Sequence, residues 1–354
     1  MNVVQSHAMT EPAPLGLPDA PKRVVVLWIG RLGDFVVTTP VLRSIRRRFP
    51  SAQVTLVVGD KGREIAELCP DVDRILTLRK ATSPVANLRL AFGLWSEPAD
   101  LLIDLNSAHS RASDALARVA RAPVKLAFDK GRGAGPFNRT LAKPADTEHM
   151  LDRYARMAAA LGAPYEPSPR VEVGAAAALE AAGKFRELMA DPAWRGRAGP
   201  VVAVHPGNFK KYDNRWPEEK FVELTDRLLD RPGVRVAYLA GPGEEREVAA
   251  LVARLKSPVP VVPPMPMALT AAFLSQLDLL VVNATGTAHL AAAVGTPTFC
   301  FLGRYTKTVW MPRTGPHQSV VSDSWESCRE IPVDAAWAAL ARMLDGLARR
   351  SPAD

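Results

Sequence analysis

Cysteine and long apolar runs are scarce in this chain of 354 residues. Its three cysteines, Cys69, Cys300 and Cys328, are too few and too scattered for a disulfide framework or a metal site, so we expect them to be packing residues. No apolar run approaches the roughly 18 to 20 residues that a membrane-spanning helix needs. Residues 1–21 also lack the basic start and continuous apolar core of a signal peptide. We therefore predict a cytoplasmic protein.

Several signatures of other function classes are missing as well. No predicted strand is followed by GxGxxG, which disfavours a dehydrogenase, and no GK[ST] ending supports a P-loop ATPase. No recognised nucleic-acid-binding module is present, so we predict no nucleic-acid partner. His205 and His289 do not stand at a metal-ligand spacing, and no carboxylate cluster accompanies them. We predict that the protein uses no metal.

The net charge of +8 is concentrated in the first half of the chain. Between Lys22 and Arg170 there are 24 basic and 15 acidic residues, whereas the stretch from Pro200 to Glu330 contains 14 and 13. Such a one-sided excess indicates an anionic partner, such as a phosphorylated lipid, a membrane surface or nucleic acid. A general solubility charge is the other interpretation.

Short apolar runs alternate with helix-like stretches, which is the pattern of parallel sheets with crossover helices. The predicted strands are residues 24–29, 54–58, 74–78 and 101–105 in the first half, and 201–205, 234–240, 258–262, 279–283 and 298–303 in the second. The chain is longer than one hydrophobic core usually serves. We therefore predict an α/β fold of two doubly wound, Rossmann-like domains that face a central cleft.

The domain boundaries are predicted from changes in composition. The stretch APYEPSPR contains three prolines in eight residues and is typical of a linker, and a helix is expected to follow it. The predicted parts are a loose tail over 1–21, an N-terminal domain over 22–165, a linker and helix over 166–199, a C-terminal domain over 200–330, and a helix and tail over 331–354.

Three strand ends in the second half contain small or polar residues that a core would not need. These are HPGNFKKYDNRWP (205–217), AGPGEE (240–245) and NATGTAHLAAAVGTP (283–297). Parallel sheets bind ligands at this edge, so the three loops together predict a ligand site.

The third loop predicts a diphosphate site. Gly286 permits a sharp turn, and the free N–H groups of a helix that begins near Thr287 would face the ligand. The hydroxyls of Thr285 and Thr287 and the imidazole of His289 could add donors. Alternatively, one of the threonines is only an N-cap and His289 only a packing residue. Glu244 begins another helix, where acids are favoured by the dipole alone, and a ribose-binding role for it is an equal alternative.

Both halves of the chain contain a series of short motifs. They are RLGDFVVTTPVLRSIRRRFP, LLIDLN, EHMLDRYARMAAALG, HPG with RWPEEKF, AGPGEE, ATGTAHLAAAVGTPTFCFLG and a later WMP. Their order and spacing from about Arg23 to Leu347 resemble glycosyltransferase family 9, the family of lipopolysaccharide heptosyltransferases. The resemblance implies a GT-B fold with the acceptor on the N-terminal domain and a sugar nucleotide, ADP-heptose by family default, on the C-terminal domain. It implies no other cofactor.

The resemblance also implies a catalytic role for Asp34. In the family this acid is the proposed base of an inverting transfer, and it takes the proton of the acceptor hydroxyl as that oxygen attacks the anomeric carbon. A carboxylate near a helix N-terminus should stay ionised and be a weak base, which suits a late proton transfer. The alternative is an N-capping Asp.

Two positions depart from the family pattern. Ala284 stands where members commonly have Asp, and Asn214 stands where they often have Lys, so Lys210 or Lys211 could replace the missing cation. The predicted donor-binding residues are His205, Gly207, Lys210, Lys211, Glu244, Thr285, Gly286, Thr287 and His289. The departures leave a second hypothesis open, a weakened or non-catalytic member that binds nucleotide or glycan.

Acceptors of this family carry phosphates and acidic sugars, which basic side chains of the first half could bind. The predicted acceptor-binding residues are Arg43, Arg46, Arg47, Lys61, Arg63 and Arg132, with Lys130 nearby. Alternatively, the arginines are the solvated face of a helix. The same charge predicts a peripheral association with the anionic inner face of the inner membrane, which salt should weaken.

Overall fold

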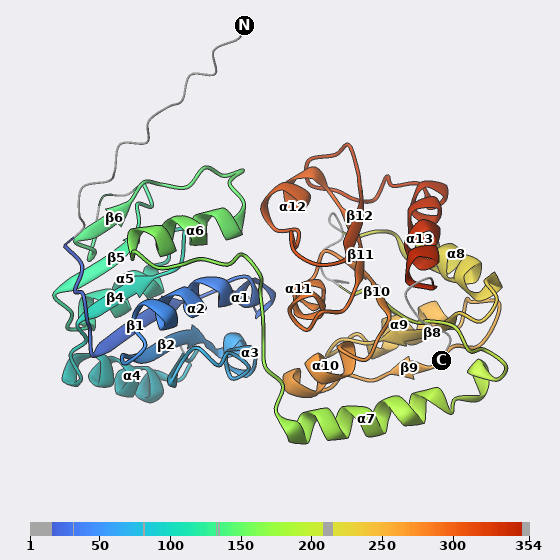
Figure 1. Cartoon of the computed structure of the whole chain (residues 1–354), viewed down its shortest axis with the longest axis horizontal. Helices are drawn as coiled ribbons and strands as arrows, with labels where there is room; N and C mark the ends of the chain where they lie inside the picture. Colours follow the sequence, from blue (N-terminus) through green and yellow to red (C-terminus); the bar gives the residue numbers. More distant parts are fainter. Residues whose placement is uncertain are drawn as a thin grey trace, which may run out of the picture.

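Two parallel six-stranded sheets with helices on both faces lie side by side in the computed structural model (Figure 1). The structure describes residues 16–30, 32–80, 82–131, 133, 135–207 and 215–348. The first sheet consists of β1 (Arg23–Trp28), β2 (Gln53–Gly59), β3 (Arg74–Leu78), β4 (Leu101–Asp104), β5 (Val124–Phe128) and β6 (Arg139–Leu141). The second consists of β7 (Val201–His205), β8 (Arg235–Leu239), β9 (Val261–Val262), β10 (Leu279–Asn283), β11 (Thr298–Leu302) and β12 (His317–Val321).

The two sheets have the same topology. Their strand orders are β3-β2-β1-β4-β5-β6 and β12-β11-β10-β7-β8-β9. In each half the first strand lies between the second and the fourth, which is the order of a dinucleotide-binding sheet. The prediction of two doubly wound domains is confirmed.

Helices connect the strands and cover the sheets. The first half contains α1 (Leu32–Val36), α2 (Thr39–Arg48), η1 (Asp60–Gly62), α3 (Arg63–Ala66), α4 (Pro84–Ser96), α5 (Arg111–Val119) and α6 (Met150–Ala160). The rest contains α7 (Ala175–Met189), η2 (Pro192–Trp194), α8 (Glu218–Asp230), α9 (Glu245–Val252), α10 (Met267–Leu274), α11 (Gly286–Ala293), α12 (Arg304–Val309) and α13 (Val333–Ala348). The predicted helices after the linker and at the C-terminus correspond to α7 and α13.

The sequence predicted the central strands and missed three others. Strands such as β1 and β10 are almost wholly buried between helix layers, so they are continuous apolar runs. By contrast, β5, β6 and β12 include polar or charged positions such as Lys125, Arg139 and His317, and two of the three are edge strands. The strand predicted over 258–262 is limited to β9, because Pro258 and Pro260 have no N–H group to donate to a neighbouring strand.

The two halves share buried apolar residues. One hydrophobic cluster includes Val26 of β1 and Phe35 of α1 together with Ala288 of α11 and Leu280 of β10. The segment between α6 and α7 runs between the halves, and α7 then packs against α10 (Figure 1). The predicted residue boundaries of the domains stay predictions.

The three cysteine thiols are all buried and unbonded. Burial raises the pKa of Cys69, Cys300 and Cys328 to about 12 in each case. Thiols of this kind are unreactive, as expected for packing residues.

Candidate functional site

The motif residues gather where the strand order of each sheet reverses. In the first sheet β1 lies beside β4, and in the second β7 lies beside β10. The carboxyl ends of such neighbouring strands leave a crevice that binds ligands. Asp34 follows β1, His205 ends β7, and the TGT motif follows β10. The predicted catalytic residue therefore lies at the crevice of the first sheet, and the predicted donor-binding loops lie at the crevice of the second.

The two crevices meet through a contact between α1 and α11. A Cβ placed on Gly33 would lie 2.2 Å from the Cα of Gly286, so the two backbones touch. This contact brings Asp34 of α1 close to the first turn of α11. We predicted Gly286 for a sharp turn, but it is not among the described glycines with positive φ. The close approach of the two backbones explains the absence of a side chain at Gly33.

Thr285 occupies the N-cap position of α11, but its side chain does not cap the helix. Its backbone is extended, with φ −132° and ψ 168°, and its side chain makes no capping hydrogen bond. The Oγ1 atom is buried and has no hydrogen-bond partner among the described residues. A buried hydroxyl without a partner costs about 1–3 kcal/mol. The alternative of a capping side chain is therefore wrong for Thr285, whose hydroxyl remains available to a ligand at the amide end of α11.

His289, one turn into α11, is a neutral imidazole in the folded protein. Burial, with the nearby His149 and His317 acting in the same direction, lowers its pKa from 6.5 to about 4. Its ring lies 6.4 Å from the ring of Trp310, between centroids. A neutral imidazole still has one N–H group to donate, so His289 can bind an oxygen without adding positive charge.

The low pKa of His289 predicts an acid-sensitive fold. Because the unfolded chain binds a proton at this residue below about pH 6.5 and the folded chain does so only near pH 4, stability is lost as the pH falls through this window. We expect the contribution of His289 to this loss to reach roughly 3 kcal/mol. Urea unfolding should show that the free energy of unfolding falls less between neutral pH and pH 4 in His289→Gln than in the wild type. Asn87→Ala, which removes an amide that does not titrate, provides a control and should lose as much stability as the wild type.

The loops after β7 and β8 meet around two glycines. His205 donates from Nδ1 to the carbonyl oxygen of Leu239 at 3.0 Å, which turns Nε2 toward Gly207. A Cβ on Gly207 would lie 2.5 Å from that Nε2 and 3.0 Å from Oε2 of Glu244. The same carboxylate accepts the N–H of Gly241 at 3.2 Å. The structure therefore brings together His205, Gly207 and Glu244, three of the residues predicted to bind the sugar-nucleotide donor.

Asn283, at the end of β10, joins the loops of this site and was missed by the sequence analysis. It is fully buried, accepts the backbone N–H of Trp216 at 3.0 Å and donates to the carbonyl oxygen of Pro206 at 2.8 Å. Trp216 in turn stacks on Phe301 and donates its indole N–H to the carbonyl oxygen of Ile331. The signal in the sequence that could have identified Asn283 is a polar amide at the end of an apolar strand. Asn283 positions both ends of the HPG-to-RWP loop.

Asn283→Ala should destabilise the protein by about 1–3 kcal/mol, because it leaves the buried N–H of Trp216 and the carbonyl of Pro206 unpaired. Nucleotide affinity should also fall, since the HPG loop loses its anchor. Urea unfolding and calorimetric titration measure the two effects. Asn87→Ala, which removes an exposed amide from the other half, should leave nucleotide affinity unchanged. Unchanged affinity in Asn283→Ala would contradict the positioning role.

Most of the predicted acceptor-binding cations have partners within the chain. Arg43 and Arg47 pair with Glu166 at 3.2 and 3.4 Å, and Arg46 pairs with Asp73 at 2.6 Å. These contacts hold α2 to the linker and to the β2–β3 connection, so the three arginines are not merely a solvated face. Their role in acceptor binding stays a prediction.

The remaining predicted cations differ in their surroundings. Lys61 and Arg63 are exposed on η1 and α3, which both pack against α1, and Arg63 pairs with Glu67 at 2.9 Å. Lys130 makes a buried ion pair with Asp104 at 2.6 Å. Arg132, Lys210 and Lys211 lie outside the described residues, as does Asn214.

Two further contacts join the halves beside this site. His149, before α6, donates from Nε2 to the carbonyl oxygen of Met311 at 3.0 Å, since its Nδ1 accepts the N–H of Leu151. Arg313 binds both carboxylate oxygens of Asp152, at 2.7 and 2.9 Å. The EHM and WMP motifs therefore contribute to the same contact between the halves.

Comparisons with known proteins agree with this arrangement. A family model described as glycosyltransferase family 9 (heptosyltransferase) matches residues 87–332. Lipopolysaccharide heptosyltransferase 1 of Pseudomonas aeruginosa is 30% identical over 302 residues, which cover 79% of this chain and 78% of that protein.

Solved structures show the same fold. The glycosyl transferase family 9 protein of Veillonella parvula has a TM-score of 0.80 at 18% identity and covers 94% of this chain and 99% of that one. Escherichia coli ADP-heptose LPS heptosyltransferase II has a TM-score of 0.75 at 17% identity and covers 92% and 99%. The predicted GT-B fold is confirmed.

Proposed function

The chain belongs to glycosyltransferase family 9, and we propose that it transfers heptose from ADP-heptose to an acceptor of the lipopolysaccharide core with inversion at the anomeric carbon. The names of similar proteins, a lipopolysaccharide heptosyltransferase and an ADP-heptose heptosyltransferase, support this donor and acceptor. The observation that carries the proposal is the contact of Gly33 with Gly286. It brings the helix that contains a carboxylate of one domain to the amide end of a helix of the other.

In this proposal the donor diphosphate binds at the first turn of α11. Negative charge accumulates on the diphosphate as the glycosidic bond breaks, and fixed N–H and O–H donors stabilise it. The backbone amides of Gly286 and Thr287 and the unpaired Oγ1 of Thr285 support this role. Neutral His289 adds a donor from the next turn, and Glu244 offers carboxylate oxygens to ribose hydroxyls. Lys210 and Lys211 remain the proposed source of positive charge.

Asp34 is the proposed base. It is half-buried in the first turn of α1, and its charge adds to burial in raising the pKa of Tyr154 nearby. An ionised carboxylate is a weak base, so it removes the acceptor proton only after the sugar has developed positive charge and the new bond is forming. The attacking oxygen then approaches from the side opposite the leaving diphosphate.

The acceptor is proposed to be an anionic glycolipid bound by the first domain. Lys61 and Arg63 are the best-placed of the predicted cations, because η1 and α3 pack against the helix that contains Asp34.

Among the described helices, none combines the length and the apolarity that a membrane span requires. We propose that the enzyme works in the cytoplasm at the inner face of the inner membrane.

Calorimetric titration with ADP, UDP, GDP and CDP tests the donor, and turnover of the matching sugar nucleotide with a lipopolysaccharide-core acceptor tests the reaction. Preferential binding of ADP and turnover of ADP-heptose are expected. Preferential binding of another nucleotide would mean that the donor is a sugar conjugate of that nucleotide. Binding of none of the four would favour the non-catalytic hypothesis, which Ala284 and Asn214 motivate.

A further inference from the structure

Helix α4 exposes a stripe of large apolar side chains to solvent. The α4 stripe consists of Val85, Leu88, Phe92 and Trp95, which are 62, 70, 62 and 53% exposed. Their spacing of three, four and three residues places them on one face of the helix. The opposite face, with Leu90 and Leu94 buried, already packs on the first sheet. The stripe is therefore a second apolar face that the fold does not use.

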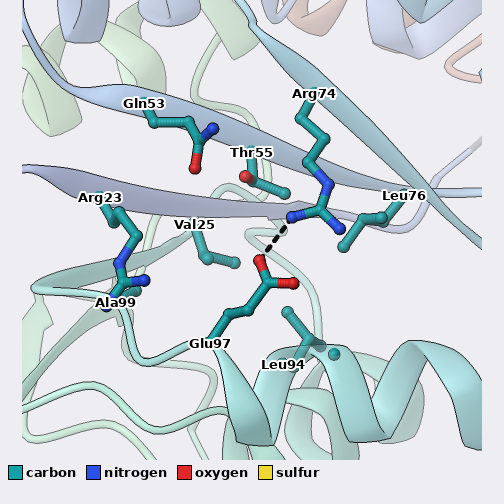
Figure 2. A pocket seen from close by; sticks show the side chains of 10 residues that line it. Arg23, Val25, Gln53, Thr55, Arg74, Leu76, Leu94, Glu97 and Ala99 are labelled. Atoms are coloured by element: carbon teal, nitrogen blue, oxygen red, sulfur yellow. Dashed lines mark hydrogen bonds and ion pairs between the residues drawn. The ribbon is translucent and has the colours of Figure 1, made fainter.

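Both ends of α4 are fixed, so the stripe is a stable surface. Near its start, Asn87 accepts the backbone N–H of Arg79 at 2.8 Å and donates to the carbonyl oxygen of the same residue at 3.1 Å. Just after its end, Glu97 pairs with Arg74 of β3, over a small hollow at the amino ends of the strands (Figure 2). Exposure of the stripe is thus a property of the folded domain.

The borders of the stripe are basic. Residues 79–96 include three basic residues, Arg79, Lys80 and Arg89, and no acidic one. Lys80 and Arg89 are exposed, and no carboxylate forms an ion pair with either side chain in the part of the chain that the structure describes. The guanidinium of Arg121 lies 6.0 Å from the ring centre of Trp95. Apolar and aromatic side chains bordered by cations are the composition of a helix that lies in the surface of an anionic membrane.

We propose that the α4 stripe docks on an anionic lipid bilayer. The four apolar side chains enter the interfacial region, and Lys80, Arg89 and Arg121 bind lipid phosphates. A second copy of the chain is a poorer occupant, because a twofold contact through α4 would bring these cations against their own copies.

Docking through α4 would hold the cleft edge of the first sheet beside the membrane surface. The N–H of Lys80 donates to the carboxylate of Asp60 at 3.3 Å, and Asp60 begins η1, which packs against α1 with Asp34. The start of α4 thus lies at the cleft edge of the sheet, and a glycolipid acceptor held in the same bilayer would approach from that side. The surface extends the proposed function, which by itself specifies no region of membrane contact.

Sedimentation of the full chain with vesicles tests the surface without any turnover. We expect binding to phosphatidylglycerol–phosphatidylethanolamine vesicles, weakened by salt, and little binding to phosphatidylcholine vesicles. The double variant Leu88→Glu/Phe92→Glu should bind at least about tenfold more weakly. Arg89→Glu should also weaken binding. Leu179→Glu on α7, where the leucine is 73% exposed, and Arg342→Glu on α13 are matched controls that should bind like the wild type.

Two results would overturn the proposal. One is wild-type vesicle binding by Leu88→Glu/Phe92→Glu when ADP titration and unfolding show the variant to be folded. The other is a wild-type dimer in the absence of lipid that this variant converts to a monomer, since a second copy would then be the occupant. Vesicle binding needs neither donor nor acceptor, so its failure is distinguishable from failure of the transferase proposal.

Discussion

Asp34→Asn should lower the turnover number by about 10²- to 10⁴-fold and leave ADP affinity unchanged. The amide keeps the size of the side chain but cannot take the acceptor proton, and the proposed nucleotide site lies on the other domain. Initial-rate measurement of ADP release, beside calorimetric ADP titration, separates the two effects. A loss of turnover without a loss of binding is what a base predicts.

The control for this variant is Glu64→Gln, which removes an exposed carboxylate from the neighbouring helix α3 and should leave turnover unchanged. Because Asp34 has contacts within the protein, unfolding of Asp34→Asn must also be compared with the wild type. Turnover by Asp34→Asn close to the wild-type value would show that another group removes the proton.

Gly33→Ala should lower turnover by about 100-fold, because a displacement of about 1 Å between reacting groups can have this effect. The new Cβ would lie 2.2 Å from the backbone of Gly286, and backbone atoms cannot rotate away as a side chain can. The first turn of α11 must therefore move away from α1. ADP affinity should change much less, since the proposed nucleotide contacts all lie on the second domain.

Gly183→Ala is the matched control for this substitution. Gly183 lies within α7 and has nothing within 4 Å of its added Cβ, so the change should leave turnover unchanged and stabilise the helix by about 1 kcal/mol. Wild-type turnover by Gly33→Ala would mean that the observed contact of α1 with α11 is not needed for the reaction.

Some elements of the fold could be predicted from the sequence and others could not, for physical reasons. Buried parallel strands such as 201–205 and 279–283 appeared with their predicted bounds, because both faces demand apolar residues. Strand β12, at an edge, was missed because its exposed positions accept polar residues. The motifs at the strand ends could be predicted as a candidate ligand site because small and polar residues there are not needed for packing.

Other features depended on contacts between distant segments. Residues far apart in the chain meet in the ion pairs of Arg43 and Arg46, in the contacts of Asn283 with both ends of one loop, and in the approach of Gly33 to Gly286. Nothing in the local pattern around an arginine shows whether its guanidinium faces solvent or a carboxylate elsewhere. The sequence also does not show that the Thr285 hydroxyl lacks a hydrogen-bond partner, because a threonine whose side chain caps a helix has the same local sequence.

The sequence by itself determined that this protein has two doubly wound domains, that it resembles a glycosyltransferase family, and which loops contain its polar motifs. Alternation of apolar runs and the order of short motifs are local properties that the chain displays before it folds. Only the tertiary structure decided that α1 and α11 touch, that Asn283 anchors both ends of one loop, and that one apolar face of α4 stays exposed while the other is buried. Those outcomes depend on which surfaces pack together, and a face of a helix is buried or free only in relation to its neighbours.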